Sequence, residues 1–98
     1  MVSHDKKYQS FLESKIKIYL HTIKIYIRDE SHLHIGHETY NTGINTHFFI
    51  QIVSDDFQGL NLLMRHRKVY SFLKQEFKSI HALRMSLLTS KEYYRNSS

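Results

Sequence analysis

The chain has 98 residues, a length typical of one small domain. Its 41% hydrophobic and 23% charged residues are ordinary for a globular protein, and no apolar run is long enough to span a bilayer. There is no cysteine, which excludes a disulfide or a thiolate ligand supplied by this chain alone. The N-terminal MVSHDKK contains no apolar secretory segment, and the net charge of +5 permits an acidic partner such as nucleic acid.

Two elements are expected in the first third of the chain. Tyr8, Leu12 and Ile16 recur at helical spacing, which predicts a helix over residues 5–20. The segment HTIKIYIRD, residues 21–29, then alternates isoleucines with longer polar side chains. This alternation predicts a strand with one buried face.

A long connection without periodicity follows the first strand. Residues 29–46 contain SHLHIGHETY and several turn-forming glycines and asparagines, and a connection of this length in a compact domain is often functional. The segment HFFIQIVS, residues 47–54, has apolar side chains on both faces, which predicts a central strand covered on both sides. The next residues, SDDFQG, predict a turn.

The second half of the chain predicts a helix and a strand. Residues 61–78, NLLMRHRKVYSFLKQEFK, are expected to form the longest helix, with Asn61 as its N-cap. Its expected inner stripe consists of Leu62, Leu63, His66, Val69, Tyr70, Leu73 and Phe77. After a short helical turn or loop around Ser79, HALRMSLLTS predicts a third strand. The polar tail is expected to fray over residues 92–98.

This order of elements favours one α+β domain over residues 1–98. The first two strands can pair as an antiparallel hairpin, and the third returns through a helical crossover, which favours a right-handed parallel connection. A three-stranded mixed sheet with the helices packed on one face is therefore the expected architecture.

Histidines are the strongest candidates for chemistry. His32, His34 and His37 lie close enough in sequence for two or three imidazoles to converge on one cation, although only Glu38 is available nearby as a further ligand, and a solvated loop is the simpler explanation. His81 lies where the chain enters the third strand. The expected topology places the start of that strand beside the start of the second strand, where the long connection ends.

The basic helix offers a different kind of site. Its cations Arg65, Arg67, Lys68, Lys74 and Lys78 could contact phosphates, although such a face is usually only solvated. The chain lacks a GxxG loop of the kind that clamps a nucleic-acid backbone. It also lacks a glycine-framed serine and a phosphate-binding glycine loop, and Asp55 and Asp56 are expected to point in different directions. No enzyme is predicted.

Four segments resemble the BolA family in order and spacing: ESHLHIGH, THFFIQIVSDDFQG, RHRKVYSFL and IHAL. The resemblance covers residues 23–89 and implies an αββααβ fold related to class II KH domains. It also implies a monothiol glutaredoxin partner, with which BolA-like proteins share a bridging [2Fe–2S] cluster that glutathione helps to hold. On this resemblance His81 is one ligand, and the loop supplies the other from His34, with His37 as the alternative.

The resemblance implies a role in cluster assembly, cluster transfer or iron signalling. Two imidazoles can replace two thiolates on one iron of such a cluster, which explains how a chain without cysteine could take part. The alternatives are a nucleic-acid-binding transcriptional regulator and an interaction module that docks glutaredoxin without metal. The expected location is the cytoplasm or the mitochondrial matrix, without membrane attachment or secretion. The isolated protein is expected to carry no cluster, and a weak homodimer is left open.

Overall fold

The structure is a computed structural model that describes residues 3–30, 47–80 and 82–97, with side chains between residues 7 and 95. Its elements are α1 (Ser3–Tyr19), β1 (Lys24–Asp29), β2 (His47–Val53), η3 (Asp55–Phe57), α2 (Leu62–Phe72), α3 (Lys74–Ser79), β3 (Ala82–Leu88) and α4 (Ser90–Ser97). Within these ranges, none of the helices has the length and apolar character needed to cross a membrane.

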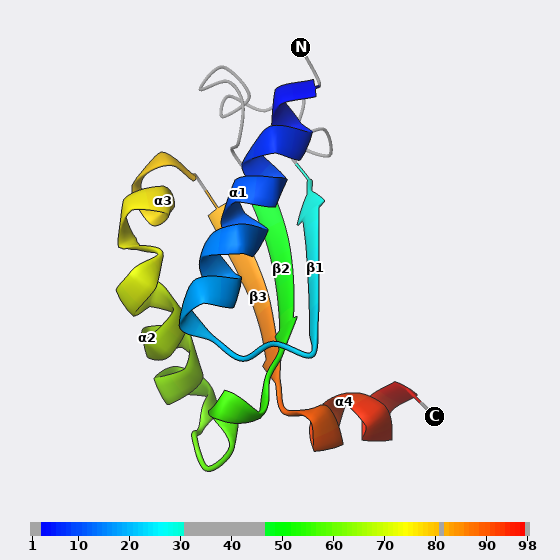
Figure 1. Cartoon of the computed structure of the whole chain (residues 1–98). Coiled ribbons are helices and arrows are strands. Elements are labelled where there is room, and N and C mark those ends of the chain that lie inside the picture. The colour runs from blue at the N-terminus through cyan, green and yellow to red at the C-terminus, as the bar shows by residue number, and fades with distance from the viewer. Residues whose placement is uncertain (1–2, 31–46, 81, 98) are drawn as a thin grey trace.

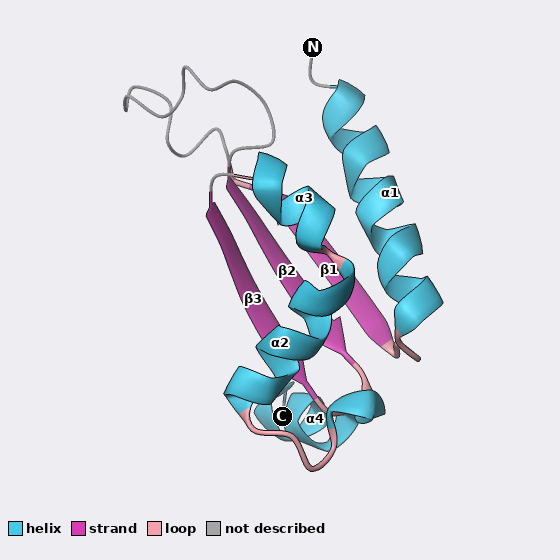
Figure 2. Cartoon of the chain, turned by 90° about the vertical axis from the view of Figure 1, so that its left-hand side faces the viewer, coloured by secondary structure: helices cyan, strands magenta, loops and turns pink. Residues whose placement is uncertain are grey.

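The three strands form one mixed sheet in the order β1-β2-β3. β1 and β2 are antiparallel, with Ile27 opposite Ile50, whereas β2 and β3 are parallel, with Ile50 opposite Met85. Figures 1 and 2 show α1, α2 and α3 together on one face of this sheet. The α+β architecture and the strand pairing expected from the sequence are therefore confirmed.

The core lies between α1, α2 and the sheet. Leu12, Ile16 and Leu20 follow one another at four-residue spacing, and at most 3% of each is exposed. They pack in one cluster with Ile50 and Ile52 of β2 and with residues of α2. The four-residue apolar spacing in α1 and the two-residue alternation in β2 thus meet in a single apolar layer.

The face of β2 that points away from the helices is only partly covered. Phe49 is half-buried there, because the guanidinium of Arg84 lies 4.7 Å above its ring centre and the Tyr26 ring packs edge-on at 6.2 Å. Val53, at the end of the strand, is completely buried. β2 is the central strand, as predicted, and side chains of the neighbouring strands cover Phe49.

The predicted long helix over residues 61–78 is wrong in its extent. The chain leaves helical geometry at Leu73, where ψ is 19°, and α2 and α3 are separate helices. The longest helix is instead α1, with 17 residues. Leu73 is completely buried, and Glu76 of α3 pairs with Lys15 of α1 at 3.0 Å. No glycine or proline marks the break, so the sequence carries no local signal for it.

The predicted inner stripe of α2 is displaced by part of a turn. Leu62 and Leu63 are 64% and 57% exposed, whereas Arg65 is buried together with Val69 and Leu73. The buried positions follow four-residue spacing, as a helix requires, but with Arg65 in place of the expected leucines. Sequence hydrophobicity misplaces this face because it assigns a charged residue to solvent.

The polar tail is also different from the expectation, because residues 90–97 form α4. Thr89 Oγ1 accepts a hydrogen bond from the Glu92 backbone N–H at 3.2 Å, and Glu92 Oε1 accepts one from the Thr89 N–H at 2.9 Å. These reciprocal bonds form a capping box, which satisfies two donors at the start of the helix. The prediction of a frayed tail is therefore wrong, and the Thr-x-x-Glu spacing at Thr89 and Glu92 is the sequence signal for this helix start.

Candidate metal-binding end of the sheet

Three chain segments meet at one end of the sheet. β1 ends at Asp29, which is opposite Phe48, and the next N–H, that of Glu30, donates to the His47 carbonyl at 2.8 Å. His47 is in turn the parallel partner of Ala82, the first residue of β3. The long connection therefore re-enters the sheet beside the start of β3, as the expected topology required, and leaves it one strand farther away.

The predicted ligands themselves are adjacent in sequence to this junction. His34, its alternative His37, and His81 all lie outside the described residues, so the ligand assignment remains a prediction. Among the residues that are described, no group of three or more histidine or carboxylate side chains is arranged to hold a metal ion. Any metal site at this end must therefore draw on the segment between Glu30 and His47, on His81, or on a partner.

A cluster of charged side chains stabilises this junction on the face of the sheet opposite the helices. Glu30 is only 8% exposed and accepts a hydrogen bond from Arg84 Nη2 at 2.8 Å, while Arg28 Nε lies 3.9 Å away. The Arg84 guanidinium also stacks on Phe49. One carboxylate thus ties the end of β1 to β3 across the central strand. No local pattern in the sequence indicates this role of Glu30, because its arginine partner lies 54 residues away.

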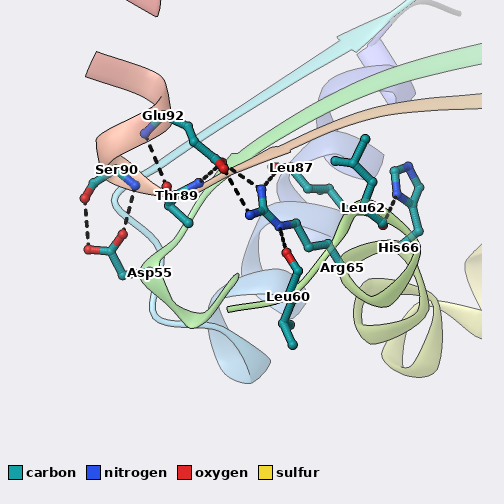
Figure 3. A network of polar contacts seen from close by, with 9 residues as sticks. All are labelled: Asp55, Leu60, Leu62, Arg65, His66, Leu87, Thr89, Ser90 and Glu92. Atoms are coloured by element: carbon teal, nitrogen blue, oxygen red, sulfur yellow. Dashed lines mark hydrogen bonds and ion pairs between the residues drawn. The ribbon is translucent and has the colours of Figure 1, made fainter. Parts of the chain in front are cut away.

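Arg65, predicted as a phosphate-binding residue, is not available for that role. It is 7% exposed, and its Nη1 donates to the Leu87 carbonyl at 2.9 Å and to Glu92 Oε1 at 2.7 Å. Its Nε donates to the Leu60 carbonyl at 2.8 Å, as Figure 3 shows. The guanidinium is therefore an internal link between α2, β3 and α4.

The same pairing changes the acidity of Glu92. Hydrogen bonds from the Arg65 guanidinium, followed by the one from the Thr89 backbone, lower the pKa of the Glu92 carboxyl from 4.5 to about 2. The carboxylate therefore stays charged below the pH at which an ordinary glutamate takes up a proton. Its ion pair with Arg65 holds α4 to the body of the protein, while the capping box stabilises the start of the helix.

The remaining predicted phosphate contacts lie on the surface. The exposed cations are Arg67, Lys68, Lys74 and Lys78. Within the described part of the chain, none of the four makes an ion pair. Beside them, His66 Nδ1 lies 2.9 Å from the Leu62 carbonyl. Because a carbonyl can only accept, this ring nitrogen is the donor of the bond.

The two neighbouring aspartates have separate structural tasks. Asp55 accepts from the Ser90 N–H at 2.8 Å and from the Ser90 hydroxyl at 2.9 Å. Asp56 accepts from the His21 N–H at 2.9 Å, and this bond is the main cause of a lowered pKa of its carboxyl. The expectation that they point in different directions is confirmed, and each fixes the start or end of another element.

Comparisons with known proteins agree with the motifs. A profile described as BolA-like protein matches residues 16–92. A Haemophilus influenzae protein named DNA-binding transcriptional regulator BolA is 38% identical over 86 residues, which cover 87% of this chain and 80% of that protein. The Arabidopsis thaliana protein named BOLA1, chloroplastic, is 37% identical over 86 residues, which cover 85% of this chain but only 54% of that protein.

A solved structure confirms the similarity of the fold. The BolA domain of SufE1 from Arabidopsis thaliana superposes with a TM-score of 0.74 at 36% sequence identity. The match covers 85% of this chain and 92% of that domain. The mixed sheet and the helices on one of its faces are therefore shared with that domain.

Proposed function

Because this chain belongs to the BolA-like protein family, we propose that it is an iron–sulfur adaptor that shares a [2Fe–2S] cluster with a monothiol glutaredoxin. Its own ligands in this proposal are His81 and one loop histidine, His34, with His37 as the alternative. Glutathione and the glutaredoxin cysteine supply the thiolates. When bound, the cluster supplies redox-active iron and sulfide that can be passed to a recipient.

The observation that carries this proposal is the junction of Glu30, His47 and Ala82. The hydrogen bond from Glu30 to His47 joins the two ends of the loop, and the pairing of His47 with Ala82 places the second of these ends beside the start of β3. Neighbouring strands lie about 4.8 Å apart, so the anchor points are within reach of one small cluster. His81 immediately precedes Ala82, which connects it to the same end of the sheet.

The donor chemistry fits an incomplete site that a partner completes. The chain has eight histidines and no cysteine, so it can offer imidazole nitrogen but no thiolate. Two imidazoles on one iron and two thiolates on the other satisfy a [2Fe–2S] cluster. Imidazole binds metal only when it is neutral, so acidification should weaken the chain's hold on the cluster.

The test is a titration with a cluster-loaded monothiol glutaredoxin and glutathione, followed by visible circular dichroism. The unmodified chain should change the spectrum, and His81→Ala and His34→Ala should abolish that change while His37→Ala retains it. His21→Ala is the matched control, because its exposed ring lies beside Asp56, at the opposite end of the sheet. An unchanged response from His81→Ala would contradict the ligand assignment.

A second measurement separates metal sharing from simple docking. The affinities for apo-glutaredoxin and for cluster-loaded glutaredoxin should both be measured by calorimetry, for the unmodified chain and for the variant carrying both His34→Ala and His81→Ala. If cluster-loaded and apo-glutaredoxin bind equally well to both proteins, the chain is a docking module without a metal role.

Nucleic-acid binding is the second candidate, supported by four exposed cations and by the name of the Haemophilus relative, a DNA-binding transcriptional regulator. The cations are Arg67, Lys68, Lys74 and Lys78. Four phosphate contacts would give a slope of about −3.6 for log K against log salt on duplex DNA. Arg67→Ala should reduce this slope by about 0.9. Binding that does not depend on salt, or no binding, would count against this function.

A further inference from the structure

A pocket opens between the two short helices and the last strand. It has a volume of about 290 Å³ and is lined by His66, Arg67 and Tyr70 of α2, Phe77 of α3 and Met85 of β3. The Tyr70 and Phe77 rings lie 4.8 Å apart and form an aromatic wall. A pocket of this size and lining suits one bulky apolar side chain rather than a large cofactor.

The pocket lies beside a sheet edge, because β3 is the last strand in the order β1-β2-β3. Figure 2 shows β3 as the outer strand, with α2 on the covered face of the sheet. The direction of the β3 carbonyl groups can be read from two hydrogen bonds. The Leu88 carbonyl accepts from Ser54 N–H, which directly follows β2, whereas the Leu87 carbonyl accepts from Arg65 Nη1.

Backbone groups of successive strand residues point to alternate sides in the sheet plane. Since Leu88 faces β2 and Leu87 faces away from it, Met85 and Leu83 also direct their N–H and C=O groups to the open side. Arg65 already occupies the Leu87 carbonyl and closes the lower part of this edge. The stretch from Leu83 to Met85 is thus available to pair with another strand, among the residues that the structure describes.

The side chains around this edge indicate what kind of strand fits. Met85 points into the pocket, so a residue opposite it on an added strand would direct its side chain to the same face. Arg67 at the pocket is exposed and makes no ion pair within the described ranges. On the other face of β3, Arg84 is 66% exposed although it pairs with Glu30. Cations therefore flank the edge on both faces.

We propose that the Leu83–Met85 edge of β3 binds an extended acidic segment of a partner protein as an added strand. One bulky apolar side chain of this segment occupies the pocket, while its carboxylates lie near Arg67 and Arg84. Backbone pairing supplies the affinity and the pocket supplies the register, as in other cases of strand addition. This surface does not depend on the cluster ligands, and its partner is distinguished by an extended acidic sequence around one bulky apolar residue.

The probe is a heptapeptide with blocked ends, Glu-Glu-Glu-Phe-Glu-Glu-Glu, titrated into the full chain labelled with ¹⁵N. Because side chains of a strand alternate between faces, the carboxylates of its second and sixth residues share the face of Phe and Arg67, and the other four share the face of Arg84. The amide signals of Leu83 and Met85 should shift, together with those of Tyr70 and Phe77. Replacing the central Phe by Ala in the peptide should weaken binding about tenfold, because the pocket then stays unfilled. Arg67→Glu should weaken binding about fivefold or more, whereas Lys68→Glu, the same charge change outside the pocket, should have a much smaller effect.

Two N-methylated peptides test the backbone pairing directly. One carries the methyl group on the Phe nitrogen and the other on the adjacent Glu nitrogen. In an added strand these two N–H groups point to opposite sides, so one methylation should abolish binding and the other should be tolerated. Equal tolerance of both would overturn the proposal. It would also be overturned if a short oligothymidylate, rather than the peptide, shifted these amides, or if dilution of the chain alone did so, which would indicate a second copy at this edge.

Discussion

Removing the Arg65 side chain should destabilise the protein by about 3 kcal/mol, even though the residue belongs to a basic segment. The Leu87 carbonyl, whose residue is 2% exposed, would lose its Arg65 donor, and an unsatisfied buried acceptor costs about 1–3 kcal/mol. The Leu60 carbonyl would also lose its 2.8 Å hydrogen bond from Arg65. Because Leu60 is half-buried, water can replace this donor, and the loss adds little to the change in free energy of unfolding. The Glu92 side chain is 39% exposed, so its pairing contributes about 1 kcal/mol or less.

The assay is urea unfolding of Arg65→Ala, followed by far-ultraviolet circular dichroism. A loss of about 3 kcal/mol corresponds to a midpoint lower by about 1.5 M when m is near 2 kcal/mol/M, and to a Tm lower by roughly 12–24 °C. Lys68→Ala is the matched control, because it removes one positive charge from an exposed position of the same helix. Equal midpoints for the two variants would refute the argument that Arg65 is an internal link.

Three further predictions concern the helix starts. Glu92→Gln should lower the free energy of unfolding near pH 7 but make little difference near pH 2. The lowered pKa of Glu92, about 2 in the folded protein, stabilises the fold above the ordinary value of 4.5, and this stabilisation is lost as the pH falls from 4.5 through 2. Unfolding midpoints of both proteins across this pH range test the prediction. Asn61→Ala removes the side chain that accepts from the Met64 N–H at 2.9 Å and should cost about 1 kcal/mol in thermal or urea unfolding. Asp55→Ala removes both bonds to Ser90 and should speed amide hydrogen exchange in α4 while leaving exchange in α1 unchanged; uniform acceleration across the chain would instead indicate global destabilisation.

Local sequence patterns are sufficient for most of the secondary structure. The alternation in β1 and β2 and the four-residue spacing of Leu12, Ile16 and Leu20 each reflect a repeat that one element imposes on its own side chains. The order of elements then restricts the topology, because a crossover between parallel strands is almost always right-handed. The capping box at Thr89 and Glu92 was equally local and could have been found in the same way.

The break at Leu73 and the burial of Arg65 depend on partners distant in the chain. Leu73 ends α2 where its side chain enters the core, and α3 then places Glu76 on Lys15, 61 residues earlier. Arg65 is charged and was assigned to solvent, yet it pairs with Glu92, 27 residues later. Neither pairing leaves a periodic signal, since a charged side chain is buried only where a complementary group happens to be brought to it.

The sequence by itself determined the family, through motifs in a fixed order, and the resemblance to that family then named His81 and His34, with His37 as the alternative, as candidate ligands. The tertiary structure alone decided which basic residues face solvent and that Arg84 of β3 pairs with Glu30 at the end of β1. The physical reason is that strand pairing and burial join residues through space, where separation along the chain no longer measures distance.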